Sequence, residues 1–383
     1  MFIHRRSRVA PASLRRLFEL AISATIATIG AVGCSERTAA EGAVGAVQSP
    51  MGLGFGGGTA TSAPGPLPSL AVDGFGRFKS PTRLAMGQGD ILYVVDTSEG
   101  VVAKHKLTGE RVGTLTGLKR PLGVGLFENT GASVTVCVVC STHGVARLAR
   151  GCERGWSGLG ASKRPLKVCH VEKVSRPRVY VGDAGDGSVR IFEGDVMVGA
   201  LGQGEVEFTQ PNAITVTSDG VVYVVDSAER VVKAYDQEGH LTATISDLGD
   251  GTQLGFPTDV AANEALGELY VSDFNARRVV VFTLSGAWVR NIEAPPNDQG
   301  DPIFFRPAGL GITPTGNLLV VDNALGAVAV ITPAGALLSS IGYREGRYWT
   351  GDLSLPIDAV SDGKRIYVTS NQTGRVGVFE VAQ

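Results

Sequence analysis

Short apolar runs alternate with turns along most of the chain, and the same order of runs returns several times. From Phe208 the letters read FTQPNAITVTSDGVVYVVDSAERVVKAYDQEGHL: a Pro, an apolar run, a Gly turn, a run that ends in Asp, and a further apolar run. Nearly the same order returns from Phe256 and from Phe305. The runs are short, rich in Val and bounded by Gly, Asp or Asn, which is typical of β-strands. A unit repeated this closely predicts a repeat architecture.

A Pro marks the start of each unit. The starts lie 40 to 50 residues apart, at Pro81, Pro121, Pro165, Pro211, Pro257, Pro307 and Pro356. Most units hold four short runs, and a unit of about 45 residues is typical of one four-stranded propeller blade. Because one blade cannot bury both faces of its sheet, we expect the units to pack side by side around an axis. The pattern predicts an all-β propeller of four-stranded antiparallel blades. We expect seven blades, with six as the alternative if the irregular second unit is an insertion.

The two ends of the repeat region predict how the ring closes. The last unit supplies three runs before Gln383, and a separate run, SLAVDGF, precedes the first Pro. We expect residues near Leu70–Asp73 to form the fourth strand of the last blade, which would leave no open sheet edge. The predicted propeller therefore covers residues 69–383.

The units resemble NHL repeats. The copies FTQPNAITV…GVVYVVDSAERVVKAYD and FPTDVAAN…ELYVSDFNARRVVVF show the Phe near the Pro, the turn, the YVxD run and the basic residue ahead of the third strand. The resemblance covers roughly residues 69–383 and implies a β-propeller. NHL propellers include binding scaffolds, RNA binders and a few enzymes, so the resemblance implies a fold and leaves the activity open.

The first 33 residues have a different pattern. Five Arg between Arg5 and Arg16 precede an uncharged, mostly apolar run from Leu20 to Val32. The run is shorter than the roughly 20 residues that cross a bilayer. It therefore predicts a signal peptide at residues 1–33, with an amphipathic or buried helix as the alternative. The letters RRLF at residues 15–18 also resemble part of a twin-arginine signal, so Sec and twin-arginine export both remain open.

The signal ends in AVGC, which resembles a bacterial lipobox with Ala31 in the place of the usual Leu. The resemblance implies that Cys34 is lipidated and becomes the mature N-terminus. Ser35 follows instead of Asp, which resembles the enterobacterial pattern for the outer membrane. Residues 34–68 are dominated by Gly, Ala, Ser, Thr and Pro, which predicts a flexible tether. We expect an exported protein that is lipid-anchored to the bacterial outer membrane, with the periplasmic or the surface face left open.

Net charge argues against a nucleic-acid partner. Without residues 1–33 the chain has 30 basic and 36 acidic side chains, a formal charge of −6. Affinity for nucleic acid comes mainly from basic residues that neutralise phosphates. We therefore expect no nucleic-acid partner.

Four further Cys fall within 33 residues of one another, at Cys137, Cys140, Cys152 and Cys169. Disulfides are expected in an exported protein. Neighbours three apart on a strand face opposite ways, so Cys137 and Cys140 are not expected to bond each other. Cys140 with Cys152 and Cys137 with Cys169 are one possible set of disulfides. Free buried thiols are the alternative, and a zinc site that adds nearby His side chains is a further one.

The third residue of each unit is predicted to face the propeller axis. Seven residues hold this position: Arg83, Gly123, Lys167, Ala213, Asp259, Gly309 and Asp358. The charged ones, Arg83, Lys167, Asp259 and Asp358, form either a salt-bridged channel or the mouth of a ligand site. The Asp residues that end the second run of each unit are interpreted as turn-forming residues.

These patterns predict a membrane-anchored, non-catalytic scaffold that binds a protein or ligand in the cell envelope without a cofactor. The alternative is a metal-dependent propeller enzyme, similar to peptidyl-hydroxyglycine lyases or gluconolactonases, with Zn or Ca. The scattered repeat positions of His105, His143, His170 and His240 argue against the lyase. Asn212 and Asp259 are the candidate cation ligands for the lactonase. The sequence assigns no catalytic residue, and it leaves the identity of the envelope partner open.

Overall fold

The computed structural model describes residues 74–128, 133–140, 166–173, 177–201, 208–344, 347–348 and 353–380. Every regular element in these ranges is a β-strand. The predicted signal peptide, Cys34, the tether and Leu70–Asp73 lie outside the described residues, as does Cys152. No helix in the described ranges is long and apolar enough to cross a bilayer.

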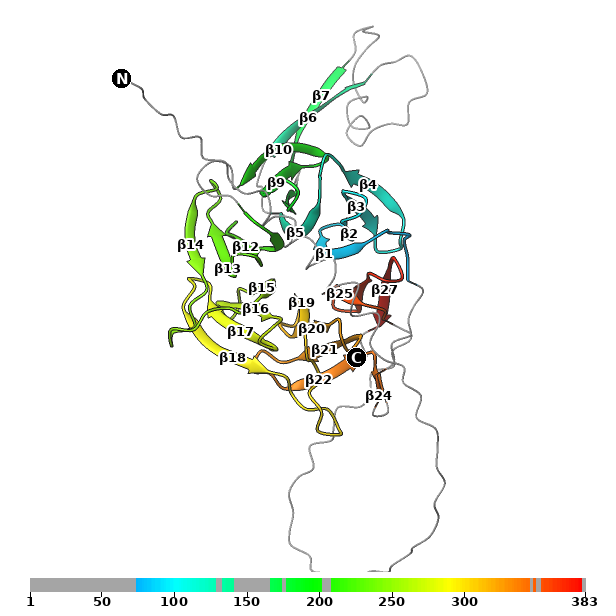
Figure 1. Ribbon diagram of the computed structural model, residues 1–383. Coiled ribbons are helices and arrows are strands. Elements are labelled where there is room, and N and C mark those ends of the chain that lie inside the picture. Colours follow the sequence, from blue (N-terminus) through cyan, green and yellow to red (C-terminus); the bar gives the residue numbers. More distant parts are fainter. Residues whose placement is uncertain are drawn as a thin grey trace, which may run out of the picture. The chain divides into compact units, whose positions relative to one another are not determined.

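Six antiparallel sheets surround a common axis (Figure 1). Five of them have four strands and the sixth has three. Each sheet starts on an inner strand whose first residue is a Pro, a position where the missing N–H costs little. The inner strands are β1 (Pro81–Gly87), β5 (Pro121–Phe127), β11 (Pro211–Val216), β15 (Pro257–Asn263), β19 (Pro307–Ile312) and β25 (Pro356–Ser361).

The remaining strands of each sheet follow outward from the axis. The second strands are β2 (Ile91–Asp96), β8 (Arg178–Asp183), β12 (Val222–Asp226), β16 (Glu268–Asp273), β20 (Leu318–Asp322) and β26 (Arg365–Ser370). The third strands are β3 (Val101–Lys106), β9 (Ser188–Glu193), β13 (Val231–Tyr235), β17 (Arg278–Thr283), β21 (Ala327–Ile331) and β27 (Arg375–Glu380). The outer strands are β4 (Arg111–Leu115), β10 (Val196–Leu201), β14 (Leu241–Ile245), β18 (Trp288–Glu293) and β22 (Leu337–Ile341).

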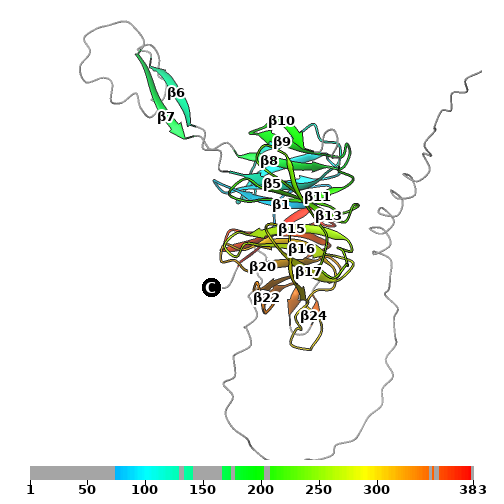
Figure 2. The ribbon, with the colours of Figure 1, turned by 90° about the vertical axis from the view of Figure 1, so that its left-hand side faces the viewer.

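The hydrophobic core is divided into layers between neighbouring sheets. Side chains from two successive sheets meet in each layer; one layer joins Val232 and Ile245 to Leu269 and Phe282. Because both faces of a sheet are covered, the second strands are mainly apolar at successive positions, and every residue after the first is buried. The inner strands contact one another in the cyclic order β1, β5, β11, β15, β19, β25. The edge-on view in Figure 2 shows β15, β16 and β17 in neighbouring positions within their sheet.

The prediction of seven blades is wrong, and the alternative of six blades is the one observed. Pro121 begins β5, but β5 pairs with β8, which begins only at Arg178. The unit predicted from Pro165 therefore has no inner strand of its own, and its RVYVGD run is the second strand of the preceding blade. Pro165 and the Val-rich run after it have the spacing expected of a further unit, so they were counted as one. The local pattern of apolar residues does not show which strands pair.

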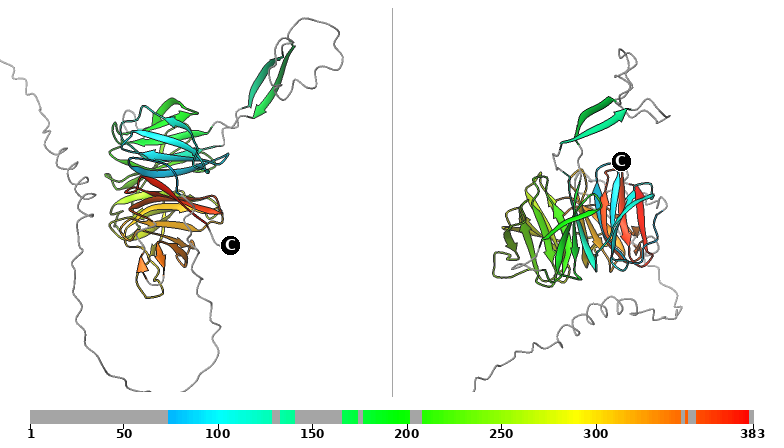
Figure 3. Two further views of the ribbon diagram at one scale, coloured as in Figure 1. Left: turned by 90° about the vertical axis from the view of Figure 1, so that its right-hand side faces the viewer. Right: turned by 90° about the horizontal axis from the view of Figure 1, so that it is seen from above.

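The residues between β5 and β8 include a separate two-stranded sheet, β6 (Ser133–Cys140) and β7 (Leu166–Lys173) (Figure 3). These strands pair only with each other. Their register places Cys137 opposite Cys169 and Cys140 opposite Leu166. The first pairing is compatible with the predicted Cys137–Cys169 disulfide, which remains a prediction. A second short hairpin, β23 (Tyr343–Arg344) and β24 (Arg347–Tyr348), follows β22.

The described N-terminal residues meet the last blade. Phe75 and Val376 of β27 exchange two backbone hydrogen bonds of 3.0 Å, and the Phe78 N–H donates to the Gly374 carbonyl at 2.9 Å. The segment therefore lies beside the outer edge of the three-stranded sheet.

The Asp at the end of each second strand has a structural role. Its carboxylate accepts hydrogen bonds from two consecutive backbone N–H groups in the segment that enters the inner strand of the same blade. Asp226, for example, accepts from Thr209 at 2.7 Å and from Gln210 at 3.0 Å. The corresponding acceptors in the other four blades are Asp96, Asp183, Asp273 and Asp322. In the last blade Ser370 contacts Ser354 instead.

Candidate functional site

A cavity of about 240 Å³ lies between the six inner strands. We call it the axial cavity. Most of the residues that line it are aliphatic or small, and several of their side chains, among them Met86, Ile214 and Ile312, pack into the core layers between the blades. Three charged residues, Arg83, Asp259 and Asp358, also line it. We call these three the axial charge cluster.

Arg83 projects from β1 and contacts four other inner strands. Its guanidinium donates to Asp259 Oδ2 at 3.0 Å and to the Thr258 carbonyl at 2.5 Å. Three longer hydrogen bonds reach carbonyl oxygens of β11, β19 and β25, at Asn212, Ala308 and Ile357. Inner strands have one unpaired edge, so their carbonyls need donors from elsewhere. The five N–H groups of one guanidinium supply several of them at once.

The two Asp side chains satisfy unpaired N–H groups on the same edges. Asp259 Oδ2 accepts from the Leu310 N–H of the next blade at 2.7 Å. Asp358 Oδ2 accepts from the Leu84 N–H of the next blade at 2.8 Å. Each carboxyl thereby links its own inner strand to the following one. The Ser272 hydroxyl accepts a hydrogen bond from the backbone N–H of Asp259, and the Thr369 hydroxyl accepts one from the backbone N–H of Asp358.

The electrostatics of the cluster are those of two carboxyls that share one cation. Arg83, Asp259 and Asp358 are each about 5% exposed. Burial and the neighbouring Asp259 raise the pKa of Asp358 to about 8. Burial also raises the pKa of Asp259, against the opposing effect of the Arg83 charge. Ionising both carboxyls would place two negative charges beside one guanidinium in a site shielded from water, which costs free energy. The pair of carboxyls therefore holds one proton at neutral pH.

Small residues at the equivalent positions make room for the cluster. Gly123, Ala213 and Gly309 hold the third position in the other three inner strands. A Cβ on Gly309 would overlap the Ile357 carbonyl oxygen. Glycine is therefore required for this close approach of β19 to β25.

The structure brings together three of the four charged residues predicted for the channel mouth. Arg83, Asp259 and Asp358 meet at the axis. Lys167 lies in β7 instead, which is not an inner strand, because the unit from Pro165 is not a blade. The pattern gave no signal for the backbone carbonyls that Arg83 binds, because the acceptors lie on four different blades.

The described histidines lie apart from the axial cavity. His105 is buried between Phe75 and Phe78, with ring centroids 5.4 Å from each, and its Nδ1 is 3.0 Å from the Gly109 carbonyl. Burial lowers the pKa of His105. His240 is exposed and pairs with Asp236 at 3.0 Å. Both therefore make local contacts away from the axis.

Asn212 and Asp259, the residues considered as cation ligands, both contact Arg83 or its partners. Asn212 donates its side-chain amide to the Thr258 carbonyl at 3.1 Å, and its own carbonyl faces Arg83 Nε at 3.4 Å. Oxygens of this kind are the donors that a hard metal ion takes. Here a guanidinium binds them. Among the described residues no group of three or more His, Cys, Asp or Glu is placed to hold a metal.

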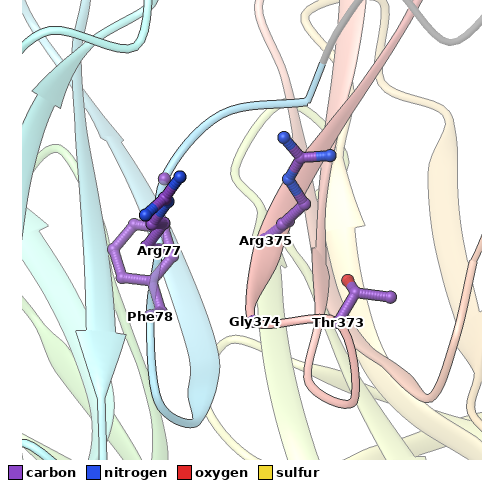
Figure 4. A pocket seen from close by; sticks show the side chains of 6 residues that line it. Arg77, Phe78, Thr373, Gly374 and Arg375 are labelled. Atoms are coloured by element: carbon purple, nitrogen blue, oxygen red, sulfur yellow. The ribbon is translucent and has the colours of Figure 1, made fainter.

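A second, open pocket lies where the N-terminal segment meets β27. We call it the seam groove; it has a volume of about 550 Å³ and is lined by Gly76, Arg77, Phe78, Thr373, Gly374 and Arg375. Figure 4 shows the side chains of Arg77 and Arg375 on opposite sides of the groove. Both are exposed, and neither forms an ion pair within the described part of the chain. No pattern along the chain pointed to this groove.

Comparison with curated proteins finds one partial match. No family model matches the chain. Protein brain tumor of Drosophila melanogaster is 28% identical over 146 residues, which are 38% of this chain. The chain covers 13% of the length of that protein. Together with the repeat pattern, the match gives the propeller an NHL-like repeat character.

Solved structures share the fold at low identity. A protein of unknown function from Bacteroides thetaiotaomicron has a TM-score of 0.52 and 14% identity, and the match covers 82% of this chain and 72% of that one. Hydrazine synthase of Kuenenia stuttgartiensis has a TM-score of 0.51 at 12% identity, covering 85% and 99%. Virginiamycin B lyase of Staphylococcus aureus has a TM-score of 0.50 at 10% identity, covering 82% and 98%. At these identities the likeness extends to the β-propeller fold alone.

Proposed function

We propose that this protein is a non-catalytic binding scaffold, held to a bacterial membrane through a lipid on Cys34. The observation that carries the proposal is the Arg83 network, which links five of the six inner strands by direct hydrogen bonds. Such a network keeps the blades in a constant arrangement. Loops on a rigid frame are favourable recognition surfaces, because little conformational entropy is lost when a partner binds.

The proposed scaffold is an envelope protein. The arginine-rich front and apolar run of residues 1–33 support export, and the AVGC letters support lipidation of Cys34. The Gly-, Ala- and Pro-rich residues 34–68 would let the propeller reach partners at a distance from the bilayer. A protein partner in the envelope fits this arrangement best.

A membrane pull-down tests the proposal. The full chain with a C-terminal tag is purified in mild detergent from membranes of the producing cells, and co-purifying proteins are identified. We expect at least one partner at a stoichiometric ratio. The Cys34→Ala variant should leave the membrane fraction, whereas the neighbouring Ser35→Ala variant should stay in it. A Cys34→Ala variant that remains with the membranes would refute the lipid anchor.

The competing proposal is a metal-dependent enzyme of the lyase or lactonase kind. Elemental analysis of the dialysed full chain separates the two proposals. Zinc or calcium retained at one equivalent per chain, and lost when Asp259 is replaced by Asn, would favour the enzyme. The guanidinium contacts of Asp259 and the Asn212 carbonyl favour the scaffold.

A further inference from the structure

The seam groove has two positive charges and no negative charge among the residues that line it. Arg77 comes from the segment before β1, and Arg375 is the first residue of β27, on the opposite side of the groove (Figure 4). Both residues are exposed, and neither guanidinium forms an ion pair with a residue of the described ranges. A groove lined by charges of one sign concentrates ions of the opposite sign, so this one favours an anion.

The lack of a carboxylate beside Arg375 has a cause in the repeat. Arg375 begins the third strand of its blade and lies opposite Ser370, the last residue of the second strand. In the blade of β16 and β17, Arg278 lies opposite Asp273 in the same way, and its Nη2 is 3.5 Å from Oδ2 of that carboxylate. The last blade therefore has a serine where the equivalent arginine of another blade has its acidic partner.

Close backbone packing fixes the floor of the groove. The Phe78 N–H donates to the Gly374 carbonyl at 2.9 Å. A Cβ on Gly374 would lie 2.3 Å from the Phe78 carbonyl oxygen, so only glycine allows this approach. The Phe78 ring also packs edge-on against the buried His105, with ring centroids 5.4 Å apart. The backbone that carries the two arginines is thus held in place, while their guanidiniums stay in solvent.

The pair of arginines indicates the class of anion. A guanidinium is a planar fork that binds a carboxylate or a phosphate through two parallel hydrogen bonds. One guanidinium already occupies both oxygens of a carboxylate. A phosphate monoester has three acceptor oxygens and a charge of about −1.5 to −2 at pH 7, so it can bind two guanidiniums and offset both charges. The groove is open and has a volume of about 550 Å³, which leaves room for the group that the phosphate esterifies.

We propose that the seam groove binds a phosphate monoester in its doubly charged form, with the phosphate between the guanidiniums of Arg77 and Arg375. The monoester is either a soluble molecule or a lipid headgroup that ends in a phosphate. This ligand goes beyond the protein partner of the proposed scaffold, and the site uses no residue of the proposed lipid anchor. Because the groove joins the segment before β1 to β27, the bound anion would also link the last blade to the chain that enters the first.

The experiment is calorimetric titration of the full chain in detergent with methyl phosphate at pH 8, in a phosphate-free buffer of constant ionic strength. At this pH methyl phosphate is doubly charged, because the second pKa of a phosphate monoester is about 6. We expect one site per chain. Dimethyl phosphate has the same phosphate with one charge fewer and should bind at least tenfold more weakly. Succinate, which has two charges on separate carboxylates, should also bind at least tenfold more weakly.

Variants of the two arginines test where the phosphate binds. Arg77→Ala and Arg375→Ala should each weaken methyl phosphate binding at least tenfold. Both variants should fold, since the side chains they remove are exposed and form no ion pair within the described part of the chain. The matched control is Arg120→Ala, which removes an exposed arginine from the segment before β5 and should leave methyl phosphate binding unchanged.

Vesicles distinguish the two sources of the phosphate. The full chain with Cys34→Ala is mixed with phosphatidylcholine vesicles that contain either phosphatidic acid, a phosphate monoester, or phosphatidylglycerol, a diester. Sedimentation with the phosphatidic acid vesicles alone, and its loss when Arg375→Ala is added, would assign the site to a lipid headgroup. Methyl phosphate binding without sedimentation would assign it to a soluble monoester.

The proposal would be overturned if neither methyl phosphate nor the phosphatidic acid vesicles bound. Equal binding of methyl phosphate, dimethyl phosphate and succinate would also overturn it, as would unchanged methyl phosphate binding in both groove variants. A positive membrane pull-down together with no binding of phosphate monoesters would leave the scaffold standing and refute only this site.

Discussion

Arg83 differs from Arg77 and Arg375 only in surroundings. The Arg83 side chain is 6% exposed and its guanidinium reaches one carboxylate and four carbonyls. Arg77 and Arg375 are exposed at the seam groove and form no ion pair within the described residues. A buried charge without partners costs several kcal/mol, whereas an exposed one is stabilised by water. Burial therefore makes Arg83 a structural residue and leaves the other two available to solvent.

Among the substitutions of these arginines, Arg83→Met is expected to lower the stability of the protein the most. The substitution leaves the Asp259 and Asp358 carboxyls buried without their cation and four carbonyls without a donor. We expect the free energy of unfolding to fall by about 3–5 kcal/mol. Urea denaturation of the full chain at pH 7 measures the loss.

The matched control is Arg375→Met. If Arg83→Met alone does not fold, the triple variant with Asp259→Asn and Asp358→Asn should recover part of the stability, because no unpaired charge then remains. Equal stability of Arg83→Met and Arg375→Met would contradict the structural role of Arg83.

A smaller effect is expected in the pH dependence of stability. In the folded protein Asp358 keeps its proton up to a pKa of about 8, whereas in the unfolded chain it loses the proton near its ordinary value of 3.8. Between these values the folded state binds more protons, so this group makes the protein less stable as pH rises. The slope is at most about 1.4 kcal/mol per pH unit for one proton.

Asp358→Asn should remove that slope, with a constant loss of about 1 kcal/mol because an amide N–H₂ cannot accept one of the two backbone N–H groups. Urea denaturation at intervals between pH 5 and pH 8 gives the slopes, and Asp301→Asn serves as the surface control. The pairing of Asp358 with Asp259 and Arg83 would be refuted by parallel slopes in the natural protein and Asp358→Asn.

The smallest effect is expected at the seam groove. Arg77→Ala and Arg375→Ala remove exposed side chains that make no ion pair within the described ranges, so each should change the free energy of unfolding by less than about 0.5 kcal/mol. Thermal unfolding of both variants checks this. If either variant lost as much free energy of unfolding as Arg83→Met, the exposure of Arg77 and Arg375 would not explain why they differ from the buried Arg83.

The pattern of residues within each unit predicted the strands of a blade correctly, but it gave the wrong number of blades. The Pro that begins each inner strand and the Asp that ends each second strand are set by turn chemistry within one blade, so a single sequence reveals them. The false unit at Pro165 arose because β6 and β7 have the same strand composition as a blade. No local feature separates a Val-rich hairpin from a blade strand.

The candidate site was predicted in part for the same reason. The third position of each unit correctly gave Arg83, Asp259 and Asp358, since strand alternation and the shared Pro place equivalent residues toward the axis. It wrongly included Lys167 with them, because that assignment depended on the blade count. The charge state of Asp358 could not be predicted, because it depends on burial by six strands.

The sequence by itself determined the strand units, their turns and the residue types at the axis, since these follow from interactions between neighbours along the chain. Only the tertiary structure decided that β5 pairs with β8 and that Arg83 meets Asp259, 176 residues away. Such contacts depend on which sheets become neighbours around the axis. That choice is made by the packing of whole sheets against one another, which the order of apolar and polar residues within one unit does not record.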